Sequence, residues 1–154
     1  MNEDWSCIGE ESKDPYTQIC VEAVEDDDVF KKFKSDPRYT AILEHVPVEQ
    51  GRLYAEDILQ YDIDDNLISS FKDNDLIGGS NTFNYGGSIG IVSPSTLRYM
   101  QNALDISTFF GEGELNKIVE IGGGYGGLCK TINCLCDFGE YHIYDMEAAS
   151  KLQE

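Results

Sequence analysis

A glycine-rich stretch, EIGGGYGG at residues 120–127, holds the residues best suited to chemistry. Gly122, Gly124 and Gly127 match G-x-G-x-x-G, a pattern whose bare backbone lets a nucleotide ligand approach closely. Asp145 lies at the end of the next expected strand, where it is placed to accept hydrogen bonds from ribose hydroxyls. Two ligands fit this pattern, a pyrophosphate-bearing dinucleotide and S-adenosylmethionine, and both contain a ribose.

Glu120 distinguishes these two ligands by charge. It lies two residues before the first glycine of the motif, where a carboxylate repels a pyrophosphate in a partly desolvated site. S-adenosylmethionine has no phosphate and carries a sulfonium and an ammonium, which a carboxylate attracts. The pattern therefore favours S-adenosylmethionine and disfavours a nicotinamide-dependent oxidoreductase. The alternatives are that Glu120 faces solvent, that the glycines form only a tight turn, and that Asp145 is an ordinary helix cap.

The elements around the glycines predict one βαβ unit. A strand at 117–121 precedes the loop, and apolar residues with helical spacing follow it until Gly139 ends the helix. A second strand at 141–144 ends at Asp145, and a short helix begins after it. Two strands joined in this way are parallel, with a right-handed crossover.

Upstream of this unit the sequence predicts helices and one long loop. Asp36-Pro37 and Ser93-Pro94 each place a capping residue before a proline, which is typical of a helix start. We expect helices from these points to about 46 and 109, and another through about 60. Residues 74–93 are rich in glycine and asparagine and are expected to form a long loop, the kind of segment that often has a function.

Composition limits the classes of function. The 154 residues carry a net charge of −18, which disfavours binding to nucleic acid or to anionic lipid. Half of that charge falls in residues 1–28, which we expect to be an acidic, flexible leader. No apolar run is long enough to cross a bilayer and the first residues do not resemble a signal peptide, so we expect a cytoplasmic protein. Its cysteines are then reduced, and their spacing indicates no metal site: Cys7, Cys20, Cys129, Cys134 and Cys136.

Several segments together resemble one enzyme family, the sugar O-methyltransferases among the class I S-adenosylmethionine-dependent methyltransferases. VEIGGGYGGLC at 119–129 looks like the first motif of that superfamily. The subgroup also has an asparagine- and glycine-rich segment and then a helix start, which correspond here to NDLIGGSNTFNYGG at 74–87 and SPSTLRYM at 93–100. YHIYDM at 141–146 is similar to the strand that carries the ribose-binding acid. The resemblance covers about residues 30–154.

The resemblance implies transfer of a methyl group from S-adenosylmethionine to a hydroxyl of a sugar or nucleotide sugar. Met146 would flank the adenine, and the residues implied to bind the cofactor are Glu120, Gly122, Gly124, Gly126, Asp145 and Met146. The residues implied to cover the cofactor or the acceptor are Asn81, Asn84, Tyr85, Ser93, Thr96, Arg98 and Tyr99. For Arg98 and Tyr99, an ordinary helix surface is an equal alternative.

The implied fold is α/β, with a helical and loop cap over 29–111 and the start of a Rossmann-like domain over 112–154. Family members continue the sheet beyond the second strand, so the expectation is a truncated or split product whose unpaired strand edges favour self-association or a partner chain. No catalytic base is identified, because neither His45 nor His142 is well placed for that role. The alternative is a non-catalytic remnant that binds the cofactor, or an interaction module.

Overall fold

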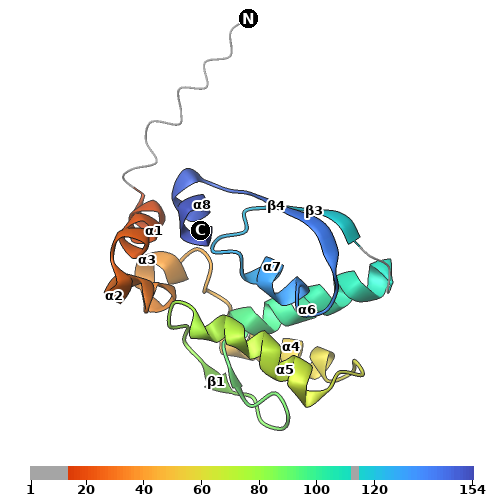
Figure 1. Ribbon diagram of the computed structural model, residues 1–154. Helices are drawn as coiled ribbons and strands as arrows, with labels where there is room; N and C mark the ends of the chain where they lie inside the picture. The colour runs from red at the N-terminus through yellow and green to blue at the C-terminus, as the bar shows by residue number, and fades with distance from the viewer. Residues whose placement is uncertain (1–13, 112–114) are drawn as a thin grey trace, which may run out of the picture.

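The computed structural model describes residues 14–111 and 115–154, a mixture of helices and small sheets (Figure 1). This confirms the α/β class in its general form. The expected leader lies outside the described residues from 1 to 13, and the expected domain boundary at 112 also falls outside them. No helix in the described ranges combines the length and the apolar character needed to cross a membrane.

The C-terminal part contains the expected pair of parallel strands. Strand β3 (Leu115–Ile121) pairs with β4 (Phe138–Tyr144), and Ile121 lies opposite Tyr144 at the end of the ladder. Helix α7 (Gly127–Ile132) connects the strands, and α8 (Glu147–Gln153) follows β4. Gly139 lies within β4 rather than ending a helix. A side chain there would meet the carbonyl of Asn116 at 2.7 Å, so close pairing of the strands explains this glycine.

One face of this sheet is exposed and mixed: Lys117, Glu140 and His142 form a charged group at one end, and an apolar patch lies toward the glycine-rich loop. Val119 and Ile121 on β3 and Tyr144 on β4 have exposed fractions of 55%, 85% and 63%. In a strand, alternate side chains point to opposite faces, so the next positions along β3 face the other way. Ile118 and Glu120 on that opposite face are only half-exposed.

Helix α6 (Pro94–Phe110) packs against α7 on one side and α4 (Val48–Ile58) on another (Figure 1). Its first turn is closed by Ser93, whose hydroxyl accepts the Thr96 N–H, so the predicted start is confirmed. Apolar side chains of α4, α5 (Asp65–Lys72) and α6 form one core, which includes Ile58, Ile68, Phe71, Leu97, Met100 and Leu104.

The segment expected to be one long loop contains short elements. A 3-10 turn, η3 (Asp73–Leu76), is followed by a hairpin of β1 (Phe83–Asn84) and β2 (Ile91–Val92). The start predicted at Asp36-Pro37 is also confirmed, but α3 (Pro37–Thr40) is a single turn and ends well before residue 46.

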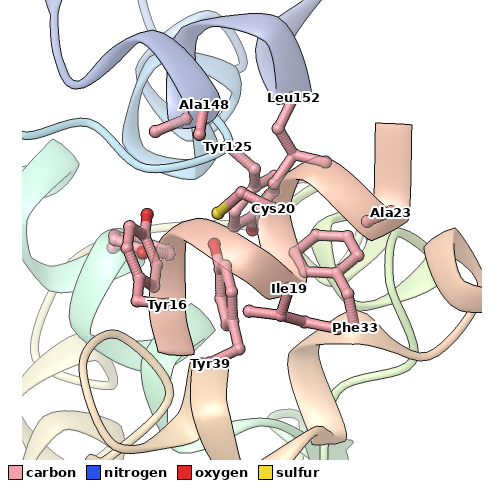
Figure 2. Close-up of a cluster of buried hydrophobic side chains, with 11 residues drawn as sticks. Tyr16, Ile19, Cys20, Ala23, Phe33, Tyr39, Tyr125, Ala148 and Leu152 are labelled. Carbon is pink, nitrogen blue, oxygen red and sulfur yellow. The ribbon is translucent and has the colours of Figure 1, made fainter. Parts of the chain in front are cut away.

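Residues 14–28 correct the expectation of a flexible leader. Helix α1 (Pro15–Glu25) is capped by Asp14, and α2 (Asp27–Phe30) and the 3-10 turn η2 (Phe33–Ser35) follow it. Helix α1 packs against α3 and α8, so the N-terminal and C-terminal segments share a core (Figure 2). The buried side chains of α1 are Tyr16, Thr17, Ile19, Cys20 and Ala23. The helical spacing of these residues indicates a buried helix face, and the acids around them occupy the exposed positions.

Candidate functional site

The glycine-rich loop connects the end of β3 to the start of α7. Gly122 and Gly124 have φ angles of 76° and 57°, in the left-handed region that favours glycine. Gly122 is exposed, and a Cβ atom built on it would meet nothing within 4 Å. A Cβ on Gly124 would lie 2.5 Å from Cδ1 of Leu43. Its left-handed backbone and its packing against Leu43 both favour glycine at position 124, and Gly122 marks the open side of the loop.

Glu120 faces this loop from the half-buried side of β3. The hydroxyl of Tyr141 donates to Oε2 of Glu120 at 2.9 Å, and a Cβ on Gly123 would lie 3.1 Å from the Glu120 carboxyl carbon. Burial raises the pKa of Glu120, and the nearby charge of Asp145 raises it further, while the Tyr141 hydrogen bond lowers it. Glu120 therefore points at the loop, where the negative charge of Asp145 acts on its carboxyl group.

Asp145 closes the loop onto the end of β4. Its Oδ2 accepts the backbone N–H of Gly124 at 2.7 Å, and its Oδ1 accepts the N–H of Met146 at 2.7 Å. Met146, not Asp145, is the N-cap of α8, so the helix-cap alternative does not describe this acid. A carboxylate has about four acceptor positions, so these two bonds leave about two for a ligand. Met146 beside it is exposed, and Gln153 of α8 donates to the carbonyl of Gly124 at 2.6 Å.

Aromatic side chains from α1 and α3 cover the loop. Figure 2 shows Tyr16 and Tyr39 lying near Tyr125 of the loop, with Cys20 among them. The hydroxyl of Tyr39 is buried without a hydrogen-bond partner in the described part of the chain, and it lies 3.5 Å from the Cβ position of Gly124. Burial raises the pKa of Cys20 to about 11, and Asp145 contributes to that rise. This cover was not predicted, because the acidic residues 1–28, which include α1, were expected to be a flexible leader.

The segment before α6 is attached to the loop by a buried polar network. Asp75 accepts from the Ser93 N–H, the Ser93 hydroxyl and the Thr96 hydroxyl, each at 2.7 Å. The amide of Asn74 donates to the Thr96 hydroxyl oxygen at 2.7 Å, and the Tyr125 hydroxyl donates to Asn74 Oδ1 at 2.5 Å. Ser93 and Thr96 were expected to cover a ligand, but both are buried and their hydroxyls hold this network together.

Lys34, which no sequence motif indicated, completes the network. Its side chain is fully buried, and Nζ donates to the carbonyl of Asn74 at 2.9 Å. The same nitrogen lies 3.8 Å from the centre of the Tyr125 ring. Burial lowers the pKa of Lys34 to about 8, although Glu44 and Asp75 oppose the shift.

The other expected cover residues are divided between two places. Tyr99 is buried against the start of α7, where a Cβ on Gly127 would meet its ring at 2.8 Å, and the guanidinium of Arg98 lies 5.4 Å from that ring. Asn84 and Tyr85 instead belong to the hairpin: Asn84 accepts the Gly86 N–H at 2.9 Å, and Tyr85 packs against the α4–α6 core. The contacts of Asn84 and Tyr85 thus lie at the hairpin and not at the glycine-rich loop.

The remaining residues considered as functional lie elsewhere. Asn81 and His45 line a pocket on the side of α3 and α6. His142 is on the exposed face of the sheet, where its Nε2 lies 2.9 Å from Oε2 of Glu140.

Comparisons of the chain with protein-family models, with curated proteins and with solved structures found no match.

Proposed function

We propose that the chain binds S-adenosylmethionine at the glycine-rich loop and is a methyltransferase-like protein acting on a sugar-type hydroxyl. The observation that carries the proposal is the pair of carboxylates, Glu120 and Asp145, that face the loop together. The neighbours that shift the pKa of Glu120 are the Tyr141 hydroxyl and Asp145, and neither is a cation. Such a site attracts a sulfonium and an ammonium and repels a pyrophosphate.

The residues around the loop fit this cofactor. Gly122 leaves open space on the backbone where a ligand can lie, and Asp145 has acceptor positions left for ribose hydroxyls. Met146 is exposed beside Asp145, where an adenine could pack on it. When bound, the cofactor supplies an activated methyl group. The protein groups named here would bind and orient it, while burial by α1 and α3 restricts water at the other side of the loop.

A calorimetric titration with S-adenosylmethionine, S-adenosylhomocysteine and NAD tests the proposal. We expect both sulfur-containing ligands to bind and NAD to bind at least about tenfold more weakly, because of the carboxylate pair. Tighter binding of NAD would overturn the assignment. Transfer of labelled methyl to a panel of sugars and nucleotide sugars then tests the activity.

A matched pair of variants separates ligand contact from backbone strain. Gly122→Ala adds a methyl group on the open side of the loop, while Gly86→Ala adds one in the hairpin at nearly the same φ, 77° against 76°, with the same open surroundings. Both changes cost about 1 kcal/mol of stability through the left-handed backbone. Only Gly122→Ala should weaken binding, by about tenfold or more. Equal binding by the two variants would mean that the loop is only a turn.

A second candidate is an interaction module without catalysis. The observation in its favour is the exposed apolar patch of Val119, Ile121 and Tyr144, on two strands that pair only with each other among the described residues. This candidate becomes the better one if no cofactor binds in the titration and the chain associates with itself or a partner through that face.

A further inference from the structure

A separate pocket of about 300 Å³ opens beside the first turn of α6. Its lining includes Thr40, Glu44, His45, Asn81, Phe83 and Pro94. Glu120, Gly122 and Asp145 are not among its lining residues, so it is distinct from the proposed cofactor site. The volume lies at the lower end of the range for small-molecule sites and is sufficient for a ligand the size of a single sugar ring.

The polar side of the pocket is centred on a half-buried carboxylate. Burial raises the pKa of Glu44, while Lys34 and a hydrogen bond with the Ser95 hydroxyl act in the opposite direction. Thr40, His45 and Asn81 line the same pocket with polar side chains, and the Thr40 hydroxyl, which donates to the carbonyl of Pro37 at 3.3 Å, can still accept a hydrogen bond. Among the described residues, neither a lysine nor an arginine lines the pocket, and the two cations that act on Glu44, Lys34 and Arg98, lie outside its lining.

The apolar side of the pocket is formed by flat surfaces. Phe83 is 41% exposed, and Pro47 and Pro94 lie with it in the lining. An exposed ring can cover the C–H face of a ligand whose edges carry hydroxyls, while the polar side receives those hydroxyls. A phosphate or carboxylate on the ligand would meet Glu44 and the overall charge of −18.

One short segment, residues 40–44, contacts both the pocket and the glycine-rich loop. Leu43 contacts the loop, since a Cβ on Gly124 would meet its Cδ1 at 2.5 Å, while Thr40 and Glu44 line the pocket. The charge of Glu44 also raises the pKa of Tyr99 and of Tyr125, both of which pack at the start of α7. A ligand in the pocket would therefore lie next to the structure that holds the loop.

We propose that this pocket binds a hydroxyl-rich small molecule that is uncharged or carries an amine, a sugar or amino sugar, with Glu44 accepting its hydroxyl or ammonium hydrogens. That such a ligand is the methyl acceptor rests on the proposed function. Binding itself does not, because it requires only the pocket.

Saturation-transfer NMR and titration with D-glucosamine, D-glucose and D-glucose 6-phosphate test the proposal on the whole chain. We expect glucosamine to bind most tightly, glucose next, and the phosphate at least about tenfold more weakly than glucosamine. Glu44→Gln should remove the advantage of glucosamine over glucose and weaken its binding by about tenfold or more. Glu49→Gln makes the same chemical change on an exposed acid of α4 outside the lining and should change nothing.

Phe83→Ala and Asn81→Ala keep the test decisive if Glu44→Gln unfolds, because both side chains are exposed. Each variant should weaken the binding of both glucose and glucosamine, while the thermal unfolding temperature stays unchanged. The proposal would be overturned if no saturation is transferred to the two sugars, if glucose 6-phosphate binds as well as they do, or if binding is unchanged in all three pocket variants. Sugar binding without S-adenosylmethionine binding would support the pocket and reject the cofactor site, and the reverse result would reject the pocket alone.

Discussion

The glycine-rich loop and the segment from Asn74 to Thr96 use their polar groups in different ways, although their motifs together suggested a single site. At the loop, Gly122 is open to solvent and Asp145 keeps acceptor positions that no described residue uses. In the upstream segment, Asn74, Ser93 and Thr96 are buried and bonded to one another or to Asp75.

The difference shows that two polar motifs near each other can use their side chains differently: those of the upstream segment bond within the chain, and those of the loop keep unused acceptor positions. Buried polar groups must find partners, and three side chains in the upstream segment find them within 20 or so residues of sequence. Their effect on the loop is indirect, through the Tyr125 hydroxyl on Asn74 and the Lys34 ammonium over the Tyr125 ring. The loop is positioned by this network, and the groups that it leaves open are those that the proposed cofactor would contact.

The largest expected effect comes from removing the centre of the network. Asp75→Ala leaves the Ser93 N–H and two hydroxyls without their acceptor at the start of α6. We expect a loss of about 3 kcal/mol in the free energy of unfolding, since each unsatisfied buried group costs roughly 1–3 kcal/mol. Urea unfolding followed by circular dichroism measures it.

Asp73→Ala is the matched control, because Asp73 is an exposed acid in the same 3-10 turn. Its loss should stay within about 0.5 kcal/mol, as for most surface changes. Equal losses in the two variants would show that the network does not stabilise the segment and that the comparison with the loop is wrong.

The parts of the fold that local sequence determines were predictable. The starts at Asp36-Pro37 and Ser93-Pro94 are confirmed, and so is the parallel pairing of the two strands around the loop. A cap followed by proline acts within one turn of helix, and a βαβ unit within about thirty residues, so no distant contact is needed to recognise either.

The parts that depend on distant contacts were not predictable in the same way. Helix α1 has its own cap-and-proline signal at Asp14-Pro15, but its many acids suggested a leader, and its burial depends on α8 at the other end of the chain. Lysine usually lies at the protein surface, but Lys34 is buried by contacts with Asn74 and Tyr125. Only tertiary structure distinguishes such a lysine from an exposed one.

Two buried tyrosines at the loop, Tyr125 and Tyr39, test the same difference between bonded and unbonded polar groups, with a smaller expected effect on stability. Tyr125→Phe removes a hydroxyl that donates to Asn74 Oδ1 and leaves that oxygen unsatisfied, so we expect a loss of about 1–2 kcal/mol. Tyr39→Phe removes a hydroxyl that has no partner among the described residues, so stability should be unchanged or slightly higher. Thermal and urea unfolding compare the two variants. A larger loss for Tyr39→Phe than for Tyr125→Phe would contradict the assignment of these roles.

The smallest expected effect is a dependence of stability on pH that comes from Lys34. Its pKa in the folded protein is about 8, below the ordinary value near 10.4, so above pH 7.5 the unfolded chain binds more protons at this site than the folded chain does. Stability contributed by this group therefore rises with pH, by at most about 1.4 kcal/mol per unit, and levels off above the ordinary pKa. Cys20 and Tyr99, with pKa values raised to about 11 and about 12, act in the opposite direction at higher pH.

Measuring a difference between variants isolates this contribution. The charged groups that act on Lys34 are Glu44, Asp75 and Lys130, and all of them remain in Lys34→Met. Between pH 7.5 and 8.5 the wild type should gain up to about 1 kcal/mol relative to Lys34→Met in urea unfolding. Lys31→Met, which removes an exposed lysine paired with Asp28, should keep the wild-type slope. If the wild type gains nothing over Lys34→Met in this window, the ammonium is not desolvated, and the network beneath the loop is more open to water than the buried contacts of Asn74 and Tyr125 require.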